Sequence, residues 1–273
     1  MGCASPGLLH YSKVDETARS NDFLKEYIAS EMFDILTFSR ISSPGENLTV
    51  YIEGDGAAWF SRNRLSSDPT PHNPLVLQLA LQDSSPNIAY MSRPCQYVFK
   101  TGKARNCRPA HWSSHRFSEE IIAAANQSLS ILKEKTLARE INLVGYSGGG
   151  AVAVLVAARR DDIATIRTIA GNLDHMEFCR HHKVTPLQGS LNAIDVADSI
   201  KHIPQIHFSG DEDRTVPVVI ARNFAHAQFP PECSKIVTVT GASHDKGWLK
   251  KWPSLLQVAF PCPWFLETEA ELR

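Results

Sequence analysis

The segment 141–158 constrains the fold more than any other part of this sequence. Residues 141–144 form a short apolar run typical of a buried strand, and residues 151–158 form an apolar run typical of a buried helix. Between them lies Gly145-Tyr146-Ser147-Gly148-Gly149, a G-x-S-x-G sequence. A serine on a sharp strand-to-helix turn has strained backbone angles, and the flanking glycines remove clashes that larger residues would make. Because the helix start also points N–H groups toward it, Ser147 is predicted to be a nucleophile.

The rest of the chain alternates strand-like and helix-like segments. Apolar and β-branched runs predict further strands at 33–38, 48–52, 87–91, 163–169, 205–208 and 235–240. Helical patterns occupy 75–81, 118–134, 216–225 and 245–256. Strands that alternate with helices imply an α/β fold with a mostly parallel, doubly wound sheet flanked by helices.

The sequence predicts a single domain over residues 1–273, because no repeat, low-complexity tract or linker divides it. Residues 1–20 are expected to be a flexible N-terminal segment. Residues 61–74 are too rich in Pro, Ser and Asn for regular structure. Residues 171–200 are expected to form a small cap-like insert after the sixth strand.

Composition limits the partners and sites that such a chain can have. The chain has 28 Lys and Arg against 29 Asp and Glu, a net charge of -1, so we expect no nucleic-acid partner, which would need a clustered basic face. No apolar run approaches the ~18 residues of a membrane span. The sequence has no paired CxxC motif, so we expect no structural zinc site. We predict no metal, no cofactor and no obligate protein partner.

A serine hydroxyl becomes a good nucleophile only when a base accepts its proton, and an acid usually orients that base. Two later strands end in turns that carry such groups. Asp211 and Asp213 follow the strand 205–208, and His244 follows the strand 235–240. Because α/β sheets assemble their sites at the carboxyl ends of strands, His244 is predicted to be the base among the eleven histidines. Position alone leaves both aspartates open as the acid.

Acyl transfer also needs two N–H donors for the oxyanion of the tetrahedral intermediate. One is predicted at Gly148, directly after the nucleophile. The other is expected in the turn Glu53-Gly54-Asp55-Gly56 that follows the strand 48–52, with Asp55 as the donor. The same four residues also suit an ordinary tight turn. Tyr146, Trp59 and Gly56 are expected to contact a small-molecule substrate.

The residues 145–149, the run 210–217 and His244 resemble the α/β-hydrolase superfamily, and the general resemblance extends from about residue 33 to the last helix. The resemblance implies the α/β-hydrolase fold and a Ser-Asp-His triad. It favours Asp213 as the acid, because members commonly place the acid where D-x-x-V-P leads into a helix. Asp211 would then bond to backbone N–H groups of the turn.

We predict that the chain is a serine hydrolase that cleaves carboxylic esters through an acyl-enzyme intermediate, although the resemblance itself does not select a substrate. The superfamily also contains peptidases and thioesterases with the same triad, and a binding protein can retain the fold without turnover. The sequence does not choose an acyl group or a leaving group.

Two shorter segments, 51–56 and 93–97, resemble a little-characterised bacterial group of hydrolases that are often predicted to be lipoproteins. That similarity, with the N-terminal Gly2-Cys3-Ala4-Ser5, predicts a lipidated Cys3, membrane attachment and a periplasmic or outer-membrane location. An uninformative terminus is the alternative, and the protein is then expected in the cytoplasm. N-myristoylation is disfavoured because residue 6 is Pro6 rather than Ser or Thr.

The six cysteines suggest one candidate disulfide. Cys95 and Cys107 flank the loop 96–106. A disulfide that closes this loop in an oxidising compartment and two unrelated buried thiols agree equally well with the spacing.

Overall fold

The computed structural model describes residues 6–61, 63–230 and 233–262, and Cys3 lies outside them. The α-helices are α1 Pro6–Arg19, α2 Leu75–Ala80, α3 Glu119–Thr136, α4 Gly148–Ala157, α5 His175–His182, α6 Val218–Ala227 and α7 Trp248–Leu256. The strands are β1 Leu24–Ala29, β2 Asp34–Ile41, β3 Leu48–Ile52, β4 Trp59–Ser61, β5 Arg64–Leu65, β6 Asn87–Met91, β7 Ile141–Tyr146, β8 Ile163–Ile169, β9 Gln205–Gly210 and β10 Ser234–Val239.

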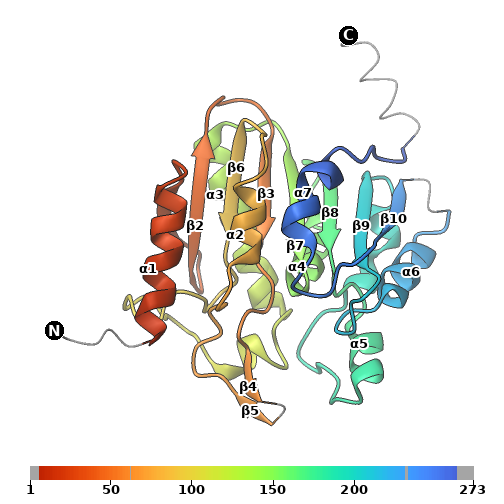
Figure 1. Cartoon of the computed structure of the whole chain (residues 1–273), viewed down its shortest axis with the longest axis horizontal. Helices are drawn as coiled ribbons and strands as arrows, with labels where there is room; N and C mark the ends of the chain where they lie inside the picture. The colour runs from red at the N-terminus through yellow and green to blue at the C-terminus, as the bar shows by residue number, and fades with distance from the viewer. Residues whose placement is uncertain (1–5, 62, 231–232, 263–273) are drawn as a thin grey trace.

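Within the described residues, eight strands form one sheet in the order β1-β2-β6-β3-β7-β8-β9-β10. The pairs β1–β2 and β2–β6 are antiparallel, whereas every pair from β6 to β10 is parallel. The predicted mostly parallel sheet flanked by helices is therefore confirmed (Figure 1).

Helices cover both faces of the sheet, and each face has its own apolar core. Buried side chains of α3, α4 and α6 pack on one face, and those of α1, α2 and α7 pack on the other. Neighbouring residues of β3 contribute to opposite clusters, Val50 to the first and Tyr51 to the second, because side chains alternate along a strand. None of the described helices has the length and apolar composition to cross a membrane.

The sheet reverses its winding between β3 and β7. From β3 the chain continues to β6 on one side and then crosses back to β7 on the other. At such a point the connections leave in opposite directions and open a crevice at the carboxyl ends of the strands. The predicted nucleophile and the predicted oxyanion turn both lie at this switch point, directly after β7 and β3.

The N-terminus departs from the expectation of a flexible segment over residues 1–20. Residues 6–19 form α1, and Tyr11, Val14 and Ala18 are buried in the second core cluster. Their spacing of three and four residues places them on one face of the helix, and burial of that face against the sheet fixes the helix. The next segment, β1, adds an edge strand that pairs with β2.

Two connections at the carboxyl ends of strands contain more structure than a plain loop. The sequence predicts an irregular segment over 61–74, but β4 ends at its first residue and β5 lies within it, and the two strands pair as a short hairpin. The predicted insert 171–200 follows β8, the sixth strand of the main sheet along the chain, and contains α5 and two short 3₁₀ helices. Figure 1 shows the hairpin and α5 at the same end of the molecule.

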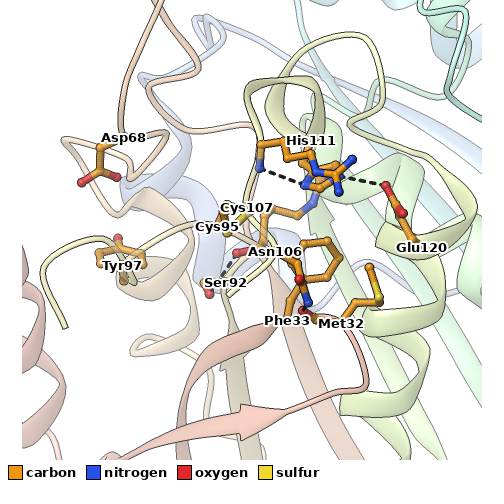
Figure 2. The surroundings of a disulfide bond; sticks show 12 residues. Met32, Phe33, Asp68, Ser92, Cys95, Tyr97, Asn106, Cys107, His111 and Glu120 are labelled. Atoms are coloured by element: carbon orange, nitrogen blue, oxygen red, sulfur yellow. Dashed lines mark hydrogen bonds and ion pairs between the residues drawn. A yellow bond between two sulfur atoms is a disulfide. The ribbon is translucent and has the colours of Figure 1, made fainter. Parts of the chain in front are cut away.

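The loop 96–106 is closed by a Cys95–Cys107 disulfide, which confirms the first of the two readings of this cysteine pair. Figure 2 shows its surroundings, where the Asn106 side chain donates a hydrogen bond to the carbonyl of Met32. A second disulfide that the sequence did not suggest joins Cys233 and Cys262.

Candidate active site

The turns after β3 and β7 touch because these strands are neighbours in the sheet. Their parallel register pairs Ile52 with Gly145. A Cβ atom added to Gly54 would lie 3.0 Å from Cδ1 of Tyr146 and 3.3 Å from Cβ of Ser147. The predicted oxyanion turn therefore lies against the predicted nucleophile, although 90 residues separate them in the sequence.

The backbone at Ser147 has the strain expected of a nucleophile turn. Its backbone angles are φ 51° and ψ −119°, in a region that residues with a Cβ atom rarely adopt. A Cβ on Gly145 would lie 2.4 Å from the carbonyl oxygen of Gly149, and a Cβ on Gly149 would lie 2.3 Å from that of Ile52. The flanking glycines are thus required by backbone contacts, as the sequence indicated.

Three side chains from three turns meet at this edge of the sheet. Nε2 of His244 lies 3.0 Å from Oγ of Ser147, and Nδ1 of His244 lies 2.9 Å from Oδ2 of Asp213. The carboxyl group of Asp213 is fully buried, whereas the His244 ring is partly exposed. The structure therefore brings together the three residues that the sequence nominated separately.

The two aspartates of the turn after β9 have different partners. Asp213 accepts hydrogen bonds from the backbone N–H groups of Thr215 and Val216, both at 2.8 Å, and its second oxygen faces His244. Asp211 accepts a hydrogen bond from the N–H of Gly241 at 2.7 Å. Asp213 is thus the carboxylate at the imidazole, and Asp211 links the turns after β9 and β10.

Two aromatic residues hold the His244 loop. The hydroxyl of Tyr146 donates a hydrogen bond to the His244 carbonyl at 3.0 Å, and the two rings lie 5.3 Å apart. The indole N–H of Trp248 donates to the carbonyls of Ser243 and His244. Burial raises the pKa of Tyr146, which keeps its hydroxyl protonated as a donor. Contact between Tyr146 and a substrate stays a prediction. Trp248 was not singled out in the sequence.

The two predicted oxyanion donors have free N–H groups. Gly148 is the first residue of α4, where an N–H group has no partner within the helix. The N–H of Asp55 lies in the turn after β3 and donates to no other described residue. Neither N–H group is therefore used by a hydrogen bond within the described part of the chain.

Two arginines that no sequence pattern relates to the site bind the side chain of Asp55. Nη1 of Arg93 lies 3.2 Å from Oδ1, and Nη1 of Arg116 lies 3.0 Å from Oδ2. Both arginine side chains are buried. Arg93 follows β6, and Arg116 precedes α3, so no local pattern relates them to Asp55.

Glu53 is the first residue of the turn after β3, and both of its carboxyl oxygens have partners. One carboxyl oxygen accepts a hydrogen bond from the N–H of Gly54 at 2.9 Å, and the other accepts one from the hydroxyl of Tyr90 at 3.1 Å. Complete burial raises the pKa of Glu53 from 4.5 to about 7, because a buried carboxylate loses its hydration. The side chain therefore links the turn after β3 to Tyr90 of β6.

The raised pKa of Glu53 predicts a pH-dependent stability. Because the folded protein holds the Glu53 proton more tightly than the unfolded chain does, this contribution is greatest below pH 4.5 and is lost as the pH rises through about 7. A shift of this size corresponds to roughly 3 kcal/mol. Glu53→Gln cannot ionise, so the free energy of unfolding of this variant should lack this pH dependence. Urea unfolding at several pH values between 4.5 and 8 measures it.

The exposed Glu134→Gln in α3 is the matched control, since it removes a carboxyl group without altering a buried one. Its unfolding free energy should follow that of the wild type across the pH range. Parallel curves for Glu53→Gln and the wild type would contradict a raised pKa at Glu53.

Gly56 and Trp59 lie further along the same connection. Gly56 has φ +65°, and a Cβ there would lie 2.1 Å from the carbonyl oxygen of Pro69, so backbone packing requires glycine. Trp59 begins the β4–β5 hairpin and is about half exposed. Their contact with a substrate stays a prediction.

A second histidine, His207 of β9, lies in the core. His207 is buried in β9 with Nδ1 2.8 Å from Oγ1 of Thr168, and burial lowers its pKa to about 3. It is therefore a neutral packing residue. The described part of the chain contains no group of three or more His, Cys, Asp or Glu arranged to hold a metal ion.

No family model matches this sequence, and the search of curated proteins found no match. Solved structures share its fold. Est1E from Butyrivibrio proteoclasticus has 15% identity and a TM-score of 0.63 over 90% of this chain and 99% of its own. Another structure of Est1E has ferulic acid bound. The Pyrococcus furiosus esterase Pf2001 has 12% identity and a TM-score of 0.62, over 87% and 89% of the two chains.

A third similar structure is an alpha-beta serine hydrolase homologue from Coxiella burnetii, with 15% identity and a TM-score of 0.57 over 85% of this chain and 93% of its own. Identities this low establish the architecture alone. The sheet order, the strained serine turn after β7 and these structural similarities agree. The chain has the α/β-hydrolase fold.

Proposed function

We propose that this protein is a serine hydrolase that cleaves carboxylic esters through an acyl-enzyme intermediate. The proposal is carried by one observation, the hydrogen-bonded chain from Ser147 through His244 to Asp213 at the carboxyl edge of the sheet. Esterases are among the structures that share the fold, and they support cleavage of an ester.

The partners of His244 determine the direction of proton transfer. A carboxylate only accepts hydrogen bonds, so Asp213 requires the proton of the neutral imidazole to be on Nδ1. Nε2 is then an acceptor for the hydroxyl proton of Ser147. As Ser147 attacks the carbonyl carbon, His244 takes this proton, and the buried Asp213 stabilises the resulting imidazolium.

The tetrahedral intermediate places a negative charge on the former carbonyl oxygen. The N–H groups of Gly148 and Asp55 bind that oxygen. His244 then gives its proton to the leaving alcohol, and the ester bond breaks to leave an acyl group on Ser147. Water, activated by His244, attacks the acyl-enzyme and restores the free serine.

A fluorophosphonate probe tests the activated serine directly, because it phosphonylates only serines with an active base. We expect stoichiometric labelling of the folded protein, with the label mapped by mass spectrometry to the peptide that contains Ser147. Heat-denatured protein should not react. Turnover of p-nitrophenyl esters, acyl-CoA thioesters and aminoacyl amides is then compared by kcat/KM.

Faster turnover of esters than of the other two classes supports the proposal. A higher kcat/KM on thioesters or amides would overturn the ester assignment and leave the serine mechanism intact. Absence of both labelling and turnover would overturn the enzyme assignment and favour a binding protein on this fold.

A further inference from the structure

The carboxylate of Asp55 lies where a negative charge opposes the proposed reaction. A Cβ atom added to Gly148 would lie 2.0 Å from Oδ1 of Asp55, so the carboxylate packs directly on the Cα of this glycine. The N–H of Gly148 is one of the two proposed oxyanion donors. A lone carboxylate at this position would repel the oxyanion that forms in the transition state.

Arg93 and Arg116 reverse the local charge. Each guanidinium bonds to one oxygen of Asp55, which gives a buried group of two cations and one anion. Arg93 also donates a hydrogen bond to the Arg116 carbonyl, and both guanidinium groups lie over the ring of Phe117, at 5.3 and 5.5 Å. The cluster thus has a net positive charge beside the oxyanion position, in a region where burial strengthens electrostatic interactions.

The space beside the two arginines does not suit a second anion. The cavity that they line with Asp55 has a volume of about 10 Å³, which is at most the room for one water molecule. The anion that these guanidinium groups bind is therefore the side chain of Asp55 itself rather than a substrate group.

We propose that Arg93 and Arg116 are positioning residues for the oxyanion hole. They cancel the charge of the Asp55 carboxylate and hold the Asp55 turn so that its N–H faces the oxyanion. The arginines act through Asp55 and do not touch the substrate. The inference rests on the proposed hydrolase function and adds two residues to it.

The experiment compares kcat and KM on p-nitrophenyl acetate for the full chain and for Arg116→Met, Asp55→Asn and the double variant. Arg116→Met leaves the carboxylate half-paired, so kcat should fall about 10- to 100-fold, somewhat less than the loss of an oxyanion donor, with KM within about threefold of the wild type. Adding Asp55→Asn removes the uncompensated charge. The double variant should therefore recover at least about tenfold in kcat over Arg116→Met.

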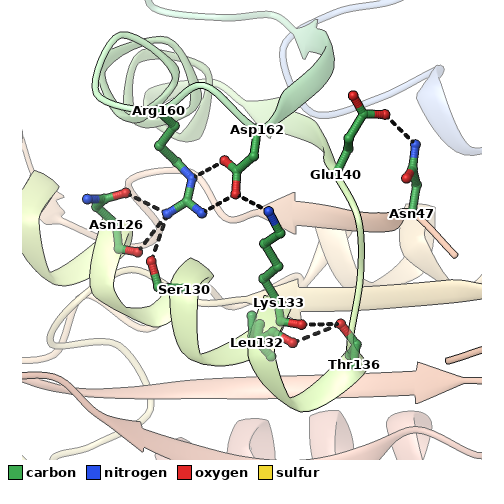
Figure 3. A network of polar contacts seen from close by, with 9 residues as sticks. All are labelled: Asn47, Asn126, Ser130, Leu132, Lys133, Thr136, Glu140, Arg160 and Asp162. Atoms are coloured by element: carbon green, nitrogen blue, oxygen red, sulfur yellow. Dashed lines mark hydrogen bonds and ion pairs between the residues drawn. The ribbon is translucent and has the colours of Figure 1, made fainter. Parts of the chain in front are cut away.

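Arg160→Met is the matched control, because its side chain has the same exposed fraction as that of Arg116, 9%, and also pairs with one aspartate. Figure 3 shows Arg160 bonded to Asp162, Asn126 and Ser130 in a polar network. Arg160 follows the C-terminal end of α4, whereas Ser147 precedes its N-terminal end. Arg160→Met should lower the melting temperature and leave kcat unchanged.

Two further measurements separate charge from folding. Arg116→Lys keeps the cation and should remain within about tenfold of the wild-type kcat. The affinity for a trifluoromethyl ketone, whose serine adduct carries an oxyanion, should fall across the variants in proportion to kcat/KM. If Arg116 acted only in folding, its substitution would lower the melting temperature, but inhibitor affinity and kcat/KM would not fall in proportion.

A double variant that is as slow as Arg116→Met, or slower, overturns the inference. So does a normal kcat for Arg116→Met. In either case, turnover by the wild type and by Arg160→Met leaves the hydrolase assignment standing. An inactive wild type overturns the hydrolase assignment, and the inference with it.

Discussion

Ser147→Ala should abolish ester turnover, with kcat reduced by about 10⁴- to 10⁶-fold. The substitution removes the attacking oxygen, and no other described hydroxyl lies within hydrogen-bond distance of Nε2 of His244. Residual activity would then come only from substrate binding and the oxyanion donors. Initial rates with a p-nitrophenyl ester, at protein concentrations high enough to detect the residual rate, measure the loss.

The fold should tolerate this change. Within the described residues, the one hydrogen bond of the Ser147 hydroxyl goes to the partly exposed His244, and alanine has a Cβ atom as serine does. The free energy of unfolding should therefore change by no more than about 0.5 kcal/mol. Ser128→Ala is the control: it removes a buried hydroxyl from α3 that bonds only to the carbonyl of Ala124. Ser128→Ala should keep the wild-type kcat. A folded Ser147→Ala variant with normal turnover would remove the nucleophile from the mechanism.

Asp213→Asn should lower kcat by about 10⁴-fold. The asparagine oxygen can still accept from the N–H groups of Thr215 and Val216, which turns its NH₂ group toward Nδ1 of His244. An NH₂ donor there favours the tautomer with the proton on Nε2. In that tautomer His244 cannot accept the proton of Ser147, so the rate should fall while the melting temperature changes little.

Asp211→Asn is the matched comparison, two residues away in the same turn. Its oxygen can still accept the hydrogen bond from Gly241, and the side chain does not reach His244, so kcat should stay within about threefold of the wild type. The reverse result, with Asp211→Asn slow and Asp213→Asn normal, would transfer the role of the acid to Asp211.

Local requirements were readable in the sequence because few residue types satisfy them. The turn around Ser147 needs glycines at 145 and 149, since backbone atoms occupy the place of a Cβ at both. The run of strand, turn and helix is set by apolar spacing within about twenty residues. Ser147, Asp213 and His244 each follow a strand, and parallel strands end at one edge of the sheet. This reasoning predicted the fold and the turns on which Ser147, Asp213 and His244 lie.

Pairings between distant side chains depended on the tertiary structure. Both aspartates follow β9 within four residues, and only the path of the turn directs Asp213 rather than Asp211 to His244. The docking of α1 likewise depended on a free apolar face of the sheet, which local composition does not reveal.

The predicted oxyanion turn best separates what the sequence predicts from what only the tertiary structure decides. The sequence placed Asp55 after β3, but it could not show that Arg93 and Arg116 would meet its carboxylate, or that Glu53 would bond to Tyr90. These contacts arise because β6 and β7 flank β3 and the segment before α3 returns to the same edge. The sequence by itself determined which strand ends carry the chemical groups, because backbone geometry is local. The tertiary structure decided which charges face one another, because sheet order and loop packing set those distances.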